Sequence, residues 1–378
     1  MNFDFNATEQ ALFKELREQL GSFAEGRSLE SSDVVLAEQN ARDALALLGG
    51  TPYLKLGLAD GNGQPNGSLA LMAAMETLAE VSQSLFLTVE VSTRIFGRAL
   101  SAWGSDEQKK KWLDPLVDGK LLGALALSED AMNVDNDPLV TEGRQEAGDI
   151  VINGAKQYVI NAPLADWIAV VGRMGNESAI FMVKQGTPGL TVSSRLNTMG
   201  YDGAVIAGLT LSDCRIPANQ VIGPFTGDTM LKSLRLWENQ VLLAATLGMM
   251  KGSYESARVW AKAHKSGGKP IIAYQEVGFK LSEMLTLYQT AQLLAYRSAW
   301  TVDNTPREAE SLTWCAKVFC TESAETVSSS ALQILAGKGY ISGNTAEQAF
   351  RCAKYSQIAG TSTELCRVKI GDNALGYK

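Results

Sequence analysis

Histidine is almost absent from this sequence, and its scarcity narrows the available chemistry. Among 378 residues there is a single histidine, His264. A histidine-rich metal site is therefore excluded, and a Ser-His-Asp or Cys-His nucleophile system would depend on that one residue. The five cysteines form no CxxC pair and no cluster with histidine: Cys214, Cys315, Cys320, Cys352 and Cys366. We therefore expect free buried thiols and no metal site.

Long apolar runs and an excess of positive charge are also missing. No stretch of about 18 or more uninterrupted apolar residues occurs, so we expect no membrane span. The first residues, MNFDFNATEQ, contain no basic segment followed by an apolar one. This start predicts no secretory signal, and the free thiols predict a reducing, cytoplasmic location. The formal net charge is −7, whereas nonspecific nucleic-acid binding needs a basic face, so no nucleic-acid partner is expected.

The first third of the chain has the pattern of helices. Hydrophobic residues make up 46% of the sequence and charged residues 20%, which is typical of a soluble globular protein. Asn6 followed by Glu9 predicts a capping box, and apolar residues then recur at helical spacing. A second apolar-periodic stretch covers residues 69–98, before the turn signal at 104–106. We predict an N-terminal helical domain over residues 1–120.

From about residue 121 the pattern changes to short apolar runs separated by Gly, Asn, Asp and Pro. The runs predict an antiparallel middle β-sheet domain over residues 121–224, with Asn153-Gly154 as a hairpin turn. Helical periodicity returns near Pro224 and predicts a C-terminal four-helix bundle over residues 225–378. The expected strands are 123–127, 149–152, 167–171, 179–183 and 205–211. The expected helices are 226–263, 275–303, 307–336 and 345 onward. The predicted fold class is α+β.

Glu238 is the residue most indicative of chemistry. It shares one helix face with small and apolar residues: Leu234, Val241, Ala245 and Gly248. A carboxylate on an apolar face loses hydration, which raises its pKa toward neutrality and suits a general base. A structural interpretation is equally compatible with the helix alone. In that case Glu238 lies at the edge of the face and reaches water, or pairs with Arg235 or Lys251.

Six stretches, in order, resemble motifs of the acyl-CoA dehydrogenase family. Any one of them is weak, but together they span essentially the whole chain and agree with the predicted changes of domain. The resemblance therefore implies the same three-part fold. The stretches are 103–109 (WGSDEQK), 126–129 (ALSE), 153–161 (NGAKQYVIN), 215–223 (RIPANQVIG), 333–339 (QILAGKG) and 359–362 (AGTS).

In that family a glutamate removes the α-proton of an acyl thioester, while the β-hydride passes to flavin N5. Most members place this base in an E-G-T-S loop, but residues 358–361 read IAGT and contain no carboxylate. Glu364, beyond this loop, is the weaker candidate. A minority, including the isovaleryl-CoA and prolyl-carrier-protein types, place the base on the first bundle helix, where Glu238 matches. The resemblance therefore favours Glu238 as the catalytic base.

The resemblance also implies a bound FAD and a set of contact residues. The backbone N–H near Gly360 and a flavin ribityl hydroxyl are expected to polarise the thioester carbonyl. FAD is expected to bind Leu127, Ser128, Tyr158, Ile160, His264, Gln333, Gly337, Gly339 and Thr361. The acyl thioester is expected to contact Trp237, Val241, Ala245 and Gly360.

Several matched positions depart from the family pattern. Ile160 stands where the family has a threonine beside the flavin ring, and Val134 stands where a serine is expected. His264 and Gly267 occupy the arginine and phenylalanine positions that reach the flavin of a neighbouring subunit. Their replacement removes a permanent cation and an aromatic surface.

These departures leave three hypotheses open. The first is FAD-dependent α,β-dehydrogenation of an acyl thioester carried by CoA or an acyl-carrier protein. Its partners would include an electron acceptor such as electron-transferring flavoprotein, and the chain would form a dimer or tetramer. The second is a flavin-poor subunit of a mixed oligomer, or a non-redox thioester-binding protein. The third is a flavin monooxygenase or nitroalkane-type oxidase.

Overall fold

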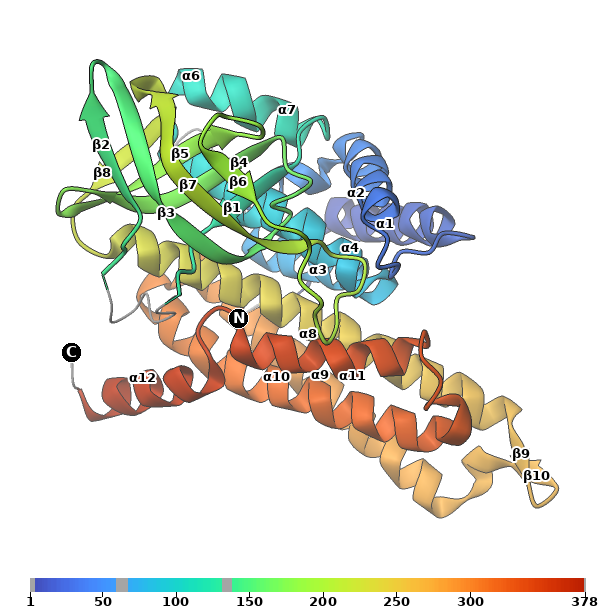
Figure 1. Ribbon diagram of the computed structural model, residues 1–378. Helices are drawn as coiled ribbons and strands as arrows, with labels where there is room; N and C mark the ends of the chain where they lie inside the picture. Colours follow the sequence, from blue (N-terminus) through green and yellow to red (C-terminus); the bar gives the residue numbers. More distant parts are fainter. Residues whose placement is uncertain (1–3, 59–66, 131–137, 377–378) are drawn as a thin grey trace.

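A computed structural model describes residues 4–58, 67–130 and 138–376. Figure 1 shows a β-sheet and a group of N-terminal helices lying side by side over a bundle of long C-terminal helices. The predicted α+β fold, with helical parts on either side of a sheet domain in the chain, is confirmed. All five cysteines are free, as expected. No helix in the described ranges is both long and apolar enough to span a membrane.

The N-terminal part consists mainly of helices. The predicted capping box is present, because the Asn6 side chain accepts a hydrogen bond from the Glu9 N–H at 3.0 Å and the Glu9 carboxylate accepts one from the Asn6 N–H at 2.9 Å. The expected stretch 69–98 is interrupted, because the Ser82 hydroxyl accepts from the Leu85 N–H and begins a new helix. The elements are α1 (Ala7–Ala24), α2 (Val34–Gly49), η1 (Pro52–Lys55), α3 (Ser68–Val81), α4 (Gln83–Glu90), η2 (Val91–Gly97), α5 (Arg98–Trp103), α6 (Asp106–Gln108), η3 (Lys109–Leu113) and α7 (Asp114–Val117).

The middle part is one sheet of mainly antiparallel strands. Its order is β6-β7-β3-β2-β4-β5-β8, and β1 pairs with β4 in parallel. The strands are β1 (Gly123–Ala126), β2 (Glu142–Glu146), β3 (Asp149–Ile160), β4 (Trp167–Met174), β5 (Glu177–Lys184), β6 (Leu190–Val192), β7 (Ile206–Pro217) and β8 (Val221–Phe225).

The hairpin turn predicted at Asn153-Gly154 is wrong. These residues lie inside β3, at a register shift against β7. The Asn153 side chain bonds the Asp213 backbone N–H at 2.9 Å, and a Cβ on Gly154 would lie 2.5 Å from Thr141 Oγ1. The pair therefore lies at a β-bulge, where β3 passes close to the residue that precedes β2. The β2–β3 turn falls at residues 147–148.

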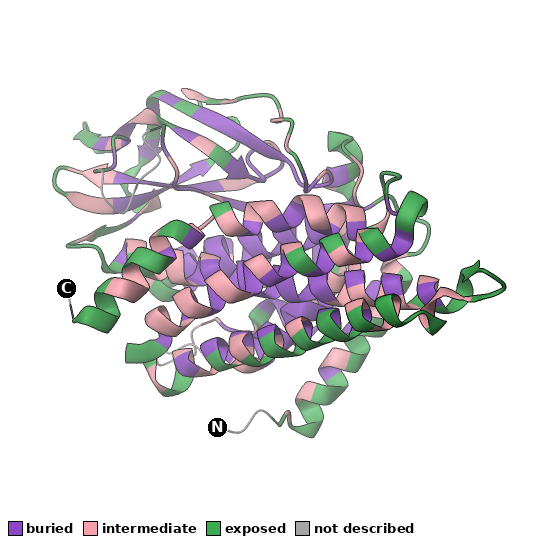
Figure 2. Cartoon of the chain, turned by 90° about the horizontal axis from the view of Figure 1, so that it is seen from below, coloured by how far each residue is buried: buried purple, intermediate pink, exposed green. Residues whose placement is uncertain are grey.

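The C-terminal part is built around α8 (Thr229–Ala263). Every residue from 239 to 250 is buried, so this stretch of α8 is enclosed on all sides. It packs against α3, α9, α10 and α11, and Figure 2 shows the buried core inside the bundle. Because Glu238 directly precedes this stretch, it lies where α8 leaves the core. The other elements are β9 (Lys265–Ser266), β10 (Lys269–Pro270), η5 (Ile271–Ala273), α9 (Gln275–Asn304), α10 (Pro306–Leu335), η6 (Ala336–Lys338), α11 (Thr345–Ile358) and α12 (Thr363–Leu375), with η4 (Ala218–Gln220) preceding β8.

Candidate active site

A cavity of about 570 Å³ lies where the three parts of the chain meet. The sheet contributes residues of β1, β3 and β7, the bundle contributes α8 and α11, and the N-terminal part contributes η2. The volume is within the range of small-molecule and cofactor sites. Most lining residues are apolar, with a few polar side chains among them. No group of metal-ligating side chains occurs in the described parts of the chain.

The sheet wall of the cavity contains four of the predicted flavin residues: Leu127, Ser128, Tyr158 and Ile160. Tyr158 has a φ of +55° at a register shift in β3. Strained backbone of this kind is concentrated at functional sites. The Tyr158 ring lines the cavity although the residue is 57% exposed, so the ring offers an aromatic surface to a ligand.

A buried ion pair fixes this wall. Lys156 Nζ donates to Glu129 Oε1 at 2.6 Å and to the Leu127 carbonyl at 2.9 Å. Glu129 also accepts hydrogen bonds from the backbone N–H groups of Val140 and Thr141. Burial lowers the pKa of Lys156 to about 8, whereas its hydrogen bond to Glu129 favours the charged form. The pair therefore holds the segment containing Leu127 and Ser128 against β3.

Glu238 lines the bundle wall of the same cavity. Arg235 Nη1 donates to Glu238 Oε2 at 2.9 Å, and the Glu238 side chain is 31% exposed. Lys251, the other predicted cation, pairs instead with Glu80 at 2.6 Å. Glu238 therefore has both features at once. It pairs with Arg235, as the structural interpretation expected, and it lines the cavity, as expected of a base. No described residue donates a hydrogen bond to Oε1, so this oxygen remains available to a ligand.

Gly360 is a backbone position at the edge of the cavity. It lines the pocket in the loop between α11 and α12, with a φ of +67° that favours glycine. No residue of the described chain accepts a hydrogen bond from the Gly360 N–H. Glu364 lies beyond the loop, exposed on the first turn of α12, and does not line the cavity. A hydrogen bond from its own backbone N–H lowers its pKa.

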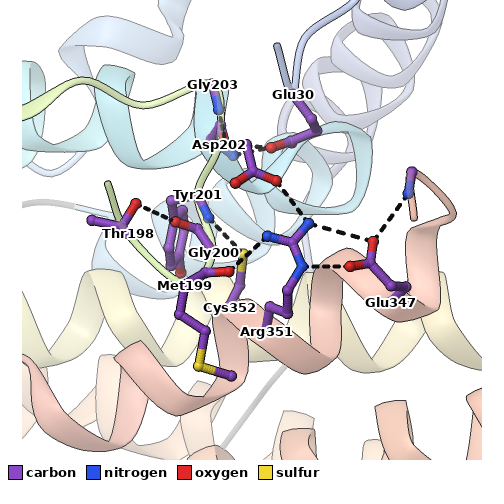
Figure 3. A network of polar contacts seen from close by, with 12 residues as sticks. Glu30, Thr198, Met199, Gly200, Tyr201, Asp202, Gly203, Glu347, Arg351 and Cys352 are labelled. Carbon is purple, nitrogen blue, oxygen red and sulfur yellow. Dashed lines mark hydrogen bonds and ion pairs between the residues drawn. The ribbon is translucent and has the colours of Figure 1, made fainter. Parts of the chain in front are cut away.

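A loop after β6 closes another side of the cavity, and Arg351 of α11 holds it (Figure 3). Arg351 donates to the Met199 carbonyl and to the Asp202 carboxylate, both at 2.7 Å. Arg351 also pairs with Glu347 one turn earlier on α11. The Tyr201 N–H reaches the sulfur of Cys352 at 3.2 Å. The loop is therefore attached to the bundle by several polar contacts.

Four predicted site residues on α8 or beside Gly360 do not line the cavity. Trp237 is buried and stacks on Trp103, with ring centroids 5.1 Å apart. Val241 and Ala245 belong to the enclosed part of α8, where neighbouring helices cover the face that sequence spacing aligned with Glu238. Thr361 is buried and bonds Asn239. In this structure these four side chains are therefore buried in the protein interior.

The remaining predicted flavin residues lie together at the far end of the bundle (Figure 1). His264 follows α8 and stacks on Trp260, with centroids 4.5 Å apart. The Lys338 ammonium lies 4.7 Å from the centroid of the same Trp260 ring, which brings the glycine loop of η6 beside His264. Gln333, Gly337 and Gly339 belong to this end and do not line the cavity of the same chain. Val134 lies outside the described residues.

Arg351, Tyr355, Lys317 and Asn239 are parts of the site that the sequence analysis missed. Tyr355 and Arg351 line the cavity, and Arg351, Lys317 and Asn239 hold its loops. Buried Lys317 was detectable as a lone lysine in the apolar pattern of α10. The others carry no local signal, because their partners are distant in the sequence.

Comparison with known proteins agrees with this arrangement. Three domain models of acyl-CoA dehydrogenase match the chain in order: the N-terminal domain at residues 12–120, the middle domain at 124–214 and the C-terminal domain at 231–375. The mitochondrial short-chain specific acyl-CoA dehydrogenase of Mus musculus is 29% identical over 314 residues, which cover 81% of this chain and 76% of the relative. A probable acyl-CoA dehydrogenase of Bacillus subtilis is 29% identical over 83% of this chain and 84% of its own length.

Solved structures share the fold over almost the full length. Butyryl-CoA dehydrogenase from Megasphaera elsdenii superposes with a TM-score of 0.88 at 22% identity, covering 99% of this chain and 100% of that one. A prolyl acyl carrier protein oxidase superposes with a TM-score of 0.84 at 23% identity, covering 98% and 100%. The matches in all three domains agree with the six motifs of the sequence and with the cavity at the junction. The chain therefore belongs to the acyl-CoA dehydrogenase family.

Proposed function

We propose that this protein catalyses FAD-dependent α,β-dehydrogenation of an acyl thioester, with Glu238 as the base that removes the α-proton. The observation that carries the proposal is that Glu238 and Gly360 line one apolar cavity. A carboxylate oxygen without a described donor and a backbone N–H without a described acceptor are the two groups that α-deprotonation of a thioester requires.

The cavity fits a flavin on its sheet side. The exposed Tyr158 ring offers an aromatic surface, and Leu127 and Ile160 provide apolar contacts beside the Ser128 hydroxyl. These four residues would hold the ring of FAD. Bound FAD supplies the acceptor for the β-hydride. The family assignment supports FAD as the cofactor, as do relatives solved with FAD or its reduced form.

Three groups of the chain would act in the proton-transfer step: the Glu238 carboxylate, Arg235 and the Gly360 N–H. Glu238 Oε1 takes the α-proton, while Arg235 holds Oε2 and limits rotation of the carboxylate. The Gly360 N–H donates to the thioester carbonyl oxygen, where negative charge builds as the proton leaves. The mostly apolar lining would accommodate the acyl chain and lower the local polarity, which strengthens both interactions.

Replacing the proposed base tests the function directly. We expect Glu238→Gln to lower turnover of acyl thioesters by about 100-fold or more, the range of general-base catalysis. Because glutamine is isosteric, folding and FAD binding should change little. The measurement is flavin bleaching by short-chain acyl-CoA under anaerobic conditions. The matched control is Glu364→Gln, which should retain activity. An active Glu238→Gln together with an inactive Glu364→Gln would reverse the assignment.

A second candidate function is the flavin-poor subunit of a mixed oligomer. His264 replaces the family's arginine, and it lies at the far end of the bundle, outside the cavity of its own chain. A complete flavin site in the family uses this end of a neighbouring subunit, so a different partner chain could supply the missing groups. A protein that remains colourless with added FAD would favour this candidate.

Several finer properties accompany the first candidate as predictions. We expect a homotetramer or dimer in the cytoplasm, with electron-transferring flavoprotein or a similar protein as electron acceptor. The acyl carrier is CoA or an acyl-carrier protein. An acidic carrier protein would need a basic docking surface, for which the exposed lysines of residues 262–269 are the candidate.

A further inference from the structure

A buried lysine lies beneath the loop that contains Gly360. Lys317 of α10 is fully buried. Its Nζ donates to the Ala359 carbonyl at 2.5 Å and to Asn239 Oδ1 at 3.3 Å. The ammonium therefore ties α10 to the residue directly before Gly360.

Asn239 completes the attachment from α8. Its Oδ1 also accepts a hydrogen bond from the Thr361 N–H at 3.0 Å, and its Nδ2 donates to Thr361 Oγ1 at 3.1 Å. A Cβ on Gly360 would lie 2.5 Å from Asn239 Oδ1, so the loop is seated directly against this amide. Asn239 adjoins Glu238 in the sequence, so one turn of α8 carries both the proposed base and the support of the opposing loop.

This polar cluster is costly to bury. Burial lowers the pKa of Lys317 to about 8, and no carboxylate lies in ion-pair distance of it within the described chain. The titratable groups that face it are Cys366 of α12 together with Glu238 and Arg235 of α8. Well-packed apolar residues would join two helices at lower cost. What the lysine adds is two directed hydrogen bonds, one of which fixes the loop backbone.

We infer that Lys317 and Asn239 are positioning residues, which hold the 359–361 loop so that the Gly360 N–H faces the cavity opposite the reacting thioester. We call this pair the loop clamp. The inference rests on the proposed function, because it assigns the Gly360 N–H to the thioester carbonyl. Neither side chain of the loop clamp lines the cavity, so each acts through the loop.

The test compares three near-isosteric changes from polar to apolar in the bundle core of the full-length, FAD-loaded protein. Lys317→Met and Asn239→Leu remove the loop clamp. Thr313→Val is the control, because Thr313 is buried one turn before Lys317 on α10 and bonds Ser298 at 2.7 Å instead of the loop. The first readout is deuterium uptake at the α-carbon of short straight and branched acyl-pantetheine thioesters in heavy water. The second is backbone amide exchange of the peptide containing residues 359–362.

We expect both clamp variants to slow α-carbon deuterium uptake at saturating thioester by tenfold or more. The half-saturating thioester concentration should rise less than threefold. Amide exchange of the 359–362 peptide should become faster. Thr313→Val should leave both readouts within threefold of the wild type at a comparable loss of Tm. The inference is overturned if the clamp variants keep wild-type uptake, or if Thr313→Val loses as much as they do. It is also overturned if the loop peptide exchanges at the wild-type rate.

Failure of the proposed function gives a different pattern. If the wild type takes up no α-deuterium, or if Glu238→Gln takes it up at the wild-type rate, the proposed function fails and the catalytic role of the clamp fails with it. If Glu238→Gln abolishes α-deuterium uptake but Lys317→Met and Asn239→Leu keep the wild-type rate, the proposed function stands and only the loop clamp is wrong.

Discussion

At the scale of single residues, the site depends on where each polar group lies relative to the buried core. Glu238 precedes the enclosed part of α8 by one residue and faces a cavity, whereas Asn239 is buried and faces a loop. Adjacent helix positions point about 100° apart, so one turn presents a carboxylate to a ligand and an amide to the protein interior. The two neighbours can therefore have separate roles.

The buried pair of Lys156 and Glu129 gives a prediction about stability. Lys156→Met should lower the free energy of unfolding by about 3–5 kcal/mol, the usual cost of leaving one charge of a buried pair uncompensated. It should also weaken FAD binding, because the Leu127 carbonyl loses its donor. Urea denaturation at neutral pH measures the first effect, and FAD titration measures the second. A loss of unfolding free energy below about 1 kcal/mol would contradict the buried pairing, because a loss of that size is typical of an exposed ion pair.

The same pair predicts how stability depends on pH. Burial acts to raise the pKa of Glu129, but hydrogen bonds from Lys156 and the Val140 N–H outweigh it and lower that pKa. Because the folded-state pKa lies below that of the unfolded chain, this contribution is present above the ordinary glutamate pKa. It is lost as the pH falls through the folded-state value. Urea denaturation of Glu129→Gln should therefore show a shallower loss of stability on acidification than the wild type.

At the scale of elements, the cavity is bounded by segments that tertiary contacts hold in place. The loop around Met199 has no regular secondary structure, and the bonds from Arg351 on α11 shown in Figure 3 are part of its attachment. α11 also contributes Tyr355 to the cavity. A change in the position of α11 would therefore alter two walls at once.

Arg351→Ala tests this attachment. The ion pairs of Arg351 with Asp202 and Glu347 are partly exposed, so each should contribute less than about 1 kcal/mol to folding. The loop, however, loses its donor to the Met199 carbonyl. We expect a small decrease in Tm and a larger increase in KM than decrease in kcat for acyl thioesters. Lys354→Ala is unsuitable as a control because Lys354 lines the cavity, so Arg367→Ala, at an exposed ion pair on α12, is used instead. Wild-type KM in Arg351→Ala would exclude a role for this attachment in binding.

At the scale of the whole molecule, the predicted flavin residues other than Thr361 fall into two separate groups. One group lines the cavity, and the other, around His264, lies at the far end of the bundle. We therefore predict that one chain presents two partial flavin sites. In the proposed homo-oligomer, the second group would meet the FAD of a neighbouring subunit.

FAD binding tests that assembly. Addition of FAD at about 100 times its Kd should stabilise the protein by about 2.7 kcal/mol and raise the Tm. His264→Arg should tighten FAD binding about tenfold or more, because a charge-assisted hydrogen bond contributes about 1.5–3 kcal/mol. The measurements are a thermal scan with FAD and an equilibrium titration.

The control for this titration is Gln289→Arg, which adds the same charge at an exposed position of α9. Restoring phenylalanine at position 267 is unsuitable. Gly267 has a φ of +58°, and a Cβ there would lie 2.6 Å from the Tyr274 hydroxyl, so the hairpin itself would be strained. If His264→Arg and Gln289→Arg bind FAD equally, the match of His264 to the family's arginine position is wrong.

The sequence by itself determined the fold family, the helix–sheet–helix order of the chain, the positions of β1, β3, β4, β5 and β7, and Glu238 as a candidate base. Periodicity, caps and short motifs are local, so they can be read along the chain. Only the tertiary structure decided that Val241 and Ala245 are enclosed, because helix spacing defines a face but not what covers it. It alone also placed Lys317 and Asn239 under Gly360. Asn239 and Thr361 are 122 positions apart, and no local pattern encodes a contact that forms only when α8, α10 and the 359–361 loop pack together.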